Sequence, residues 1–160
     1  MKITLFQSLL NQSLTYTQKA IANKPQLPVL SGILFKAEKD SCQILATDLY
    51  LGIKTTIPAQ VSQKGSAVIP GKQLKELVSM LDESEVTIET QENSVTIKSG
   101  GSTTTLSLLP LADFPDFPSV EGEEVILSQQ LLQQISQKVM PAVSNDTTRP
   151  VLTCVLFDIK

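Results

Sequence analysis

Carboxylates are the side chains with which this sequence could build a catalytic site, because it contains no histidine. The lack of imidazole excludes Ser-His-Asp and Cys-His catalysis and histidine metal ligation. A carboxylate-dependent hydrolase or nuclease would combine Asp48, which follows a predicted strand, with Asp113 and Asp116. The last two lie in a proline-interrupted segment, and no acids recur in pairs on one strand face as a two-metal site prefers. We therefore expect Asp48 to accept hydrogen bonds in a turn, and we expect no catalytic residue, metal or cofactor.

The two cysteines indicate a reducing compartment. Cys42 and Cys154 lie far apart in the sequence, each within an apolar segment typical of a strand. Buried free thiols fit this pattern better than a disulfide or a metal site. The N-terminal MKITLFQSLL lacks the apolar stretch and cleavage site of a signal peptide. No apolar run approaches the ~20 residues of a membrane span, so we expect a cytosolic protein that does not enter a membrane.

Basic residues are concentrated in the predicted helices. The net charge of −3 argues against a uniformly basic surface that coats nucleic acid. The three predicted helices contain only one acid, Glu76, and their basic residues are Lys19, Lys72, Lys75 and Lys138. A helical face with few acids could therefore approach phosphates while the rest of the chain repels them.

The first part of the chain alternates strand and helix patterns. Apolar side chains at helical spacing predict helices from Phe6 to Ile21 and from Pro70 to about Asp82. Strands are predicted at 2–5, 29–38, 42–48, 51–57, 66–70, 85–90, 94–98 and 102–110. Residues 2–57 and 66–109 thus each form a β-α-β-β-β unit. We expect an α+β domain in which both units share one antiparallel sheet, with two helices covering one face.

The sequence predicts a domain boundary near residue 120. The segment PLADFPDFPSVEGEE combines prolines with a charge run, which is typical of a connection between domains. We expect a first domain at 1–120 and the truncated beginning of a second at 121–160, with a helix from Ser128 to Ser144 and a strand from Val151 to Lys160.

An internal repeat supports this division. A shift of 122 positions places residues 3–38 on residues 125–160, and 12 of these 36 positions are identical. The alternative is convergence of two amphipathic helix-to-strand segments, which explains shared leucines better than a shared Pro-Val-Leu. The identical positions include Leu9-Leu10 with Leu131-Leu132, Asn23 with Asn145, and Pro28-Val29-Leu30 with Pro150-Val151-Leu152.

Several motifs in a fixed order resemble the beta subunit of bacterial DNA polymerase III. They are KPQLPVL (24–30) followed by ILFKAE, ATDL (46–49), VIPGK (68–72), LPLADFP (109–115), and RPVL (149–152) followed by VLF. The resemblance implies the sliding-clamp fold, with three like domains per subunit and a head-to-tail homodimer. The sheets would lie outside and the helices inside a closed ring. It implies a non-catalytic processivity factor that encircles duplex DNA during replication. Ring closure would require the third domain.

The resemblance also implies roles for particular residues. Those implied to contact duplex DNA without sequence preference are Lys24, Lys72, Asn145, Arg149, Pro150 and Val151. Arg149 and Leu152 match one wall of the pocket that binds short peptides of the replicative polymerase, the clamp loader and repair polymerases. Residues of the subunit interface are Gln73 and Leu77, together with Thr104 and Leu106 on the strand from Thr103 to Leu108.

A different class of function remains open on the residues alone. Helices rich in Gln, Ser, Thr and Asn are also typical of a solvated face on a protein-interaction domain that never meets nucleic acid. Duplex binding measured against salt concentration separates this alternative from a clamp.

Overall fold

The computed structural model describes residues 1–22, 25–117 and 125–158. The chain divides into two units, Met1–Phe117 and Pro118–Lys160. In the described residues, no helix has the length and hydropathy needed to cross a membrane.

The first unit follows the predicted order of elements, with an additional short strand, β5. Its helices are α1 (Gln7–Thr17) and α2 (Gly71–Ser79), with 3₁₀ turns η1 (Gln18–Ala20), η2 (Pro28–Ser31) and η3 (Leu111–Asp113). Its strands are β1 (Lys2–Phe6), β2 (Gly32–Glu38), β3 (Ser41–Thr47), β4 (Gly52–Pro58), β5 (Gln60–Gln63), β6 (Gly65–Pro70), β7 (Glu85–Thr90), β8 (Ser94–Ser99) and β9 (Ser102–Ser107).

The strands form two antiparallel sheets rather than the single sheet that we expected. One sheet has the order β5-β1-β7-β8-β9 and the other β4-β3-β2-β6. Each half of the unit therefore gives its first strand to the sheet of the other half, with Ile3 opposite Ile88 and Phe35 opposite Ala67. This exchange ties the halves together through two backbone ladders, β1 with β7 and β2 with β6.

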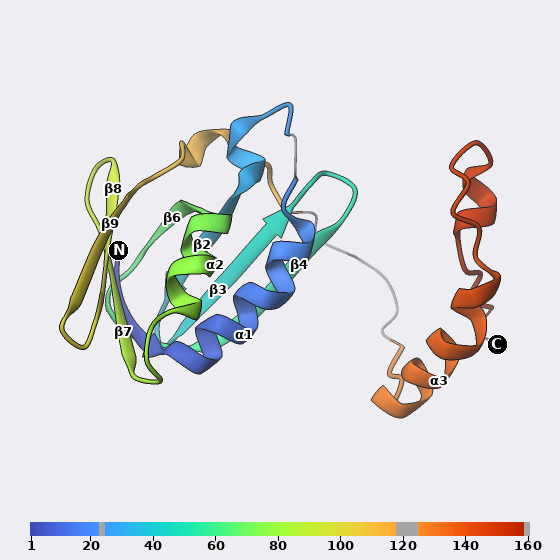
Figure 1. Ribbon diagram of the computed structural model, residues 1–160, viewed down its shortest axis with the longest axis horizontal. Coiled ribbons are helices and arrows are strands. Elements are labelled where there is room, and N and C mark those ends of the chain that lie inside the picture. The colour runs from blue at the N-terminus through green and yellow to red at the C-terminus, as the bar shows by residue number, and fades with distance from the viewer. Residues whose placement is uncertain (23–24, 118–124, 159–160) are drawn as a thin grey trace. The chain divides into compact units, whose positions relative to one another are not determined.

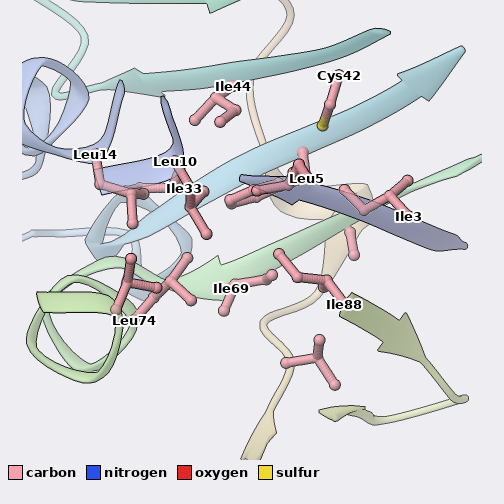
Figure 2. Packing of buried hydrophobic residues seen from close by; sticks show 14 of the residues in the cluster. Ile3, Leu5, Leu10, Leu14, Ile33, Cys42, Ile44, Ile69, Leu74 and Ile88 are labelled. Atoms are coloured by element: carbon pink, nitrogen blue, oxygen red, sulfur yellow. The ribbon is translucent and has the colours of Figure 1, made fainter. Parts of the chain in front are cut away.

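The hydrophobic core lies between the helices and the sheets. Figure 1 shows α1 and α2 side by side, with α1 packed on β3 and β4 and α2 packed on β2 and β6. Leu10 and Leu14 of α1 and Leu74 of α2 are fully buried, as the helical spacing predicted. Figure 2 shows these leucines meeting strand residues such as Ile33 and Ile44. Both helices therefore present their opposite, polar sides away from the sheets.

The second unit contains one α-helix, α3 (Gln129–Val139), followed by the 3₁₀ turns η4 (Met140–Ala142) and η5 (Pro150–Thr153) in its described part. The Ser128 hydroxyl caps α3 by accepting from the Leu131 amide at 3.2 Å. The prediction of a strand from Val151 to Lys160 is wrong for its described part, which ends at Asp158. The first residues of this segment belong to η5, and no strand follows them up to Asp158. The matching strand β2 lies between β3 and β6, and an extended segment without such partners has unsatisfied backbone groups.

The structure reproduces the internal repeat element by element. Helices α1 and α3, turns η1 and η4, and turns η2 and η5 each begin 122 residues apart. The hydrogen bonds repeat as well. The Ala22 amide donates to the Leu30 carbonyl at 3.2 Å, and the Ser144 amide donates to the Leu152 carbonyl at 3.0 Å. Convergence of two amphipathic helices would not reproduce the loop that follows each helix, so we interpret the similarity as a repeat.

The two cysteines lie in different surroundings. Cys42 is fully buried on β3, as expected. The expectation that Cys154 is buried is wrong, because this residue is exposed. Its counterpart in the repeat, Gly32, begins strand β2 and is covered by Val68 and Leu109, whereas the described residues of the second unit contain no strand that could cover Cys154.

Candidate nucleic-acid interface

The polar side of α1 and α2 is the candidate surface for phosphate. Its exposed polar residues include Ser8 and Gln12 of α1 and Lys72, Gln73, Glu76 and Ser79 of α2, and Gln18 and Lys19 of η1 continue it. Glu76 is the only acid in either helix, so repulsion of a polyanion is weak there. Uncharged polar side chains can contact a DNA backbone directly or through water at any register.

Lys72 occupies the most favourable position on this surface. It is the second residue of α2 and is exposed, and the start of a helix attracts anions through its free amides and its dipole. A hollow of about 220 Å³ lies beside it, lined by Ile21, Ala22, Pro25, Ser31, Pro70, Gly71, Lys72 and Gln73. Lys24, the other basic residue predicted for this region, lies outside the described residues.

The ammonium group of Lys75 is bound to α1, whereas its charge suggested that it would face phosphate. Its ammonium group donates to Asn11 and Thr15 of α1, at 2.5 Å from Asn11 Oδ1 and 2.7 Å from Thr15 Oγ1. Lys75 is one of the basic residues of the predicted helices, and its link to α1 was not predicted. The signal that could have found it is the spacing of Gln7, Asn11 and Thr15, which places three polar residues on one side of α1.

The predicted DNA-contacting residues of the second unit lie in one loop. Asn145, Arg149, Pro150 and Val151 are all exposed. The bond from the Ser144 amide to the Leu152 carbonyl closes this loop, and the Leu152 amide donates to the Arg149 carbonyl at 3.0 Å. The loop therefore presents one cation, Arg149, together with an amide side chain.

Asp146 adds a negative charge to the same loop. Its carboxylate accepts from the Thr148 amide at 2.9 Å, and the hydrogen bonds to Thr148 hold the pKa of Asp146 below its usual value. The group therefore stays ionised at neutral pH. This negative charge offsets part of the attraction that Arg149 offers to phosphate.

The residues predicted for the peptide pocket do not line the hollow that the structure shows in the second unit. Leu152 is 51% exposed beside Arg149. The hollow, of about 420 Å³, is lined instead by Ile135, Val139, Ala142, Val143, Cys154, Val155, Leu156, Phe157 and Asp158. The role of Arg149 and Leu152 in peptide binding therefore remains a prediction.

The residues predicted for the subunit interface lie on α2 and on an edge strand. Gln73 is exposed, whereas Leu77 and Leu106 are partly buried and pack against the same core cluster. Thr104 and Leu106 belong to β9, which is the edge of its sheet. An edge strand offers unpaired backbone groups to another chain, so the predicted role of β9 in assembly is physically possible.

Asp48, the first of the acids considered for catalysis, lies in the expected turn. The Asp48 carboxylate accepts from the amides of Tyr50 and Leu51 at 2.9 and 2.7 Å, which confirms the predicted turn. The Leu51 and Tyr50 amides lower the pKa of Asp48, so it is a poor proton acceptor. Asp113 lies in η3. Among the described residues, no group of three or more His, Cys, Asp or Glu side chains could hold a metal ion.

Comparison with known proteins agrees with the motifs. A family model described as the DNA polymerase III beta subunit, N-terminal domain, matches residues 1–118. The chain belongs to this family. It is 32% identical over 170 residues to the beta sliding clamp of Halalkalibacterium halodurans, in a match that covers 100% of this chain and 45% of that protein. The chain therefore spans less than half of this curated relative.

Solved structures of family members confirm the α+β sliding-clamp fold. The DNA polymerase sliding clamp of Bacillus subtilis matches with a TM-score of 0.88 at 28% identity, over 94% of this chain and 42% of that one. The beta clamp of Helicobacter pylori bound to a DNA ligase peptide matches with a TM-score of 0.82 at 26% identity. That match covers 90% of this chain and 41% of the Helicobacter pylori chain.

Proposed function

We propose that this chain forms the N-terminal part of a DNA sliding clamp, a ring that encircles duplex DNA and tethers the replicative polymerase to it. The observation that carries the proposal is the polar side of α1 and α2 in a chain that belongs to the beta-subunit family. On this side Lys72 is exposed at the start of α2, and Glu76 is the only acid in either helix. Residues 1–120 are the first domain. Residues 121–160 are the first part of a second domain, which the repeat of elements and hydrogen bonds supports.

The physical requirement for sliding is weak attraction that does not depend on sequence. Contacts to phosphate position a protein on DNA but carry no sequence information. A few cations, Lys24 and Lys72 in the first domain and Arg149 in the second, supply this attraction. Neutral side chains such as Gln12 and Asn145 let water complete the surface at each register. Binding by so few contacts stays weak enough for the protein to move along the duplex.

The proposed assembly and partners follow from the family. We propose a head-to-tail homodimer of the whole protein, in which Gln73, Leu77, Thr104 and Leu106 face the neighbouring subunit. Polymerases and the clamp loader would bind through short peptides near Arg149 and Leu152, a mode supported by the peptide on the Helicobacter pylori clamp. The protein would act in the cytosol and would catalyse no reaction itself.

Substitution of the proposed phosphate contacts tests the function. Lys72→Ala and Arg149→Ala should each lower duplex affinity equally for all sequences. Each should reduce the slope of log K against log salt by about 1, because one cation no longer displaces counterions. Fluorescence anisotropy with two unrelated duplexes measures both quantities. The matched control is Lys98→Ala, which removes an exposed lysine from β8 and should leave the slope unchanged.

The opposite outcomes would favour other functions. Loss of affinity for one duplex and not the other would indicate base readout. Failure of the unsubstituted chain to bind any duplex at low salt would favour the alternative, a protein-interaction domain of α+β class.

A further inference from the structure

A row of polar contacts joins α1 to α2, and we call it the α1–α2 seam. Gln7, Asn11 and Thr15 recur every four residues and so lie on one side of α1. Gln7 Nε2 donates to the Val78 carbonyl at 2.7 Å in a buried contact. Farther along α1, Lys75 Nζ donates to Asn11 Oδ1, to the Asn11 carbonyl and to Thr15 Oγ1 at 2.5, 3.3 and 2.7 Å.

The ammonium group of Lys75 is fully occupied within this seam. An ammonium has three N–H donors, and the three acceptors from α1 account for them. Thr15 supports the arrangement because its hydroxyl, which accepts from Lys75, also donates to the Asn11 carbonyl at 2.7 Å. Lys75 would have to give up a seam bond before it could donate to a phosphate. Lys72, one turn earlier on α2, is exposed.

The seam leaves a positive charge between the helices. The acceptors on Asn11 and Thr15 are neutral oxygens, and the ion pairs seen among the described residues are those of Lys2 and Lys98 with Glu89. Hydrogen bonds to a charged group are stronger than those between neutral groups. One side chain of α2 therefore holds two turns of α1 while its charge stays on the polar side of the helices.

The repeat carries the same pattern of polar positions. A shift of 122 places Gln7, Asn11 and Thr15 on Gln129, Gln133 and Gln137 of α3, so all three positions are polar again. The polar positions therefore recur in α3, but the described part of the second unit contains no second α-helix for them to contact.

We propose that Lys75 is a positioning residue, which sets α1 against α2 and is not one of the phosphate contacts. This inference rests on the proposed function for the meaning of the helical surface, but the link between Lys75 and α1 stands without it. The distinction matters because Lys72 and Lys75 look equivalent in sequence, both being lysines on the same short helix.

The test compares matched substitutions in the full chain. Lys75→Met keeps the aliphatic stem and removes the three donors, and Lys72→Met does the same at an exposed position. We expect Lys75→Met to lower Tm by about 4 °C, as loss of hydrogen bonds to a charged group predicts for a domain of this size. Lys72→Met should leave Tm unchanged. In duplex binding, Lys72→Met should reduce the salt slope by about 1 and Lys75→Met should not.

A variant that keeps the charge of Lys75 but removes its acceptors separates the positioning role of Lys75 from its charge. The double substitution Asn11→Ala with Thr15→Val removes the acceptors and retains the cation. It should lower Tm and duplex affinity with an unchanged salt slope. Combined with Lys75→Met it should add little further loss of Tm, because both changes break the same contacts.

Two results would overturn the inference. One is additivity of these Tm losses, which would show that Lys75 and α1 are not coupled. The other is a slope reduced by about 1 in Lys75→Met with Tm unchanged, which would make Lys75 a phosphate contact. If the unsubstituted chain binds no duplex, the proposed function fails, and the Tm cycle alone still decides the role of Lys75.

Discussion

Replacement of Phe35 by alanine is expected to lower the free energy of unfolding of the first unit by about 3–5 kcal/mol. Phe35 is fully buried and is among the largest such side chains. It lies on β2 opposite Ile44 on one side and Ala67 on the other, in the strand that joins both halves of the unit. The neighbours on β3 and β6 would have to collapse to fill the cavity. Urea unfolding followed by circular dichroism measures the change.

The internal repeat provides the control for this substitution. Phe157 is the counterpart of Phe35 after the shift of 122, but 52% of its surface is exposed. Phe157→Ala should change the free energy of unfolding by no more than about 0.5 kcal/mol. Equal losses for the two variants would show that the second unit has a packed core of its own, contrary to the structure.

The second large effect is the difference in reactivity between the two cysteines. Cys42 is fully buried, and this burial raises the pKa of its thiol to about 12. The thiolate is the reactive species, so at neutral pH Cys42 should react slower than an ordinary thiol by about 10³-fold or more. Cys154 is exposed. We expect a thiol reagent to modify one cysteine rapidly and the other only when the first unit unfolds.

Mass spectrometry of the modified chain identifies which cysteine has reacted. Cys154→Ser should abolish the rapid phase, and Cys42→Ala should abolish the phase that depends on unfolding. Rapid modification of Cys42 in the folded chain would contradict its burial in the hydrophobic core. Protection of Cys154 would mean that other segments cover the second unit in solution.

Periodicity predicted which faces are buried but not which strands are neighbours. The spacing of Leu10 and Leu14, and of Leu74 and Val78, was sufficient to place both helices, because a helix in a small domain must bury its apolar stripe. The exchange of β1 and β6 between the two sheets was not predictable in this way. Alternation along a strand specifies its buried side, whereas pairing depends on contacts far apart in the sequence.

The segment from Val151 to Asp158 shows the limit of local pattern. It has the residue types of a strand and matches β2 in the repeat, yet it contains a 3₁₀ turn and exposed apolar side chains such as Leu156. Strand formation requires partners on at least one edge, and β2 has partners on both. The exposure of Cys154 has the same cause.

The candidate site was predicted in part. Motifs such as VIPGK placed Lys72 at the start of α2, where the structure shows it exposed. The roles of Lys72, Gln73, Asn145 and Arg149 stay predictions, because the structure fixes their positions and not their partners. Composition alone placed Lys75 among the basic residues of the predicted helices. A sequence shows that a lysine is charged but not which acceptors its ammonium group contacts. The acceptors of Lys75 lie on α1 and depend on how the two helices pack.

The most direct test of the proposed function is an NMR titration of the isotope-labelled chain with two duplexes of unrelated sequence. At low salt, amide shifts should cluster in the exposed parts of α1 and η1 and around Lys72, and they should be the same for both duplexes. They should disappear as salt is raised, because the attraction is to phosphate. Shifts that differ between the duplexes, or an absence of shifts at low salt, would contradict the assignment of this surface to DNA.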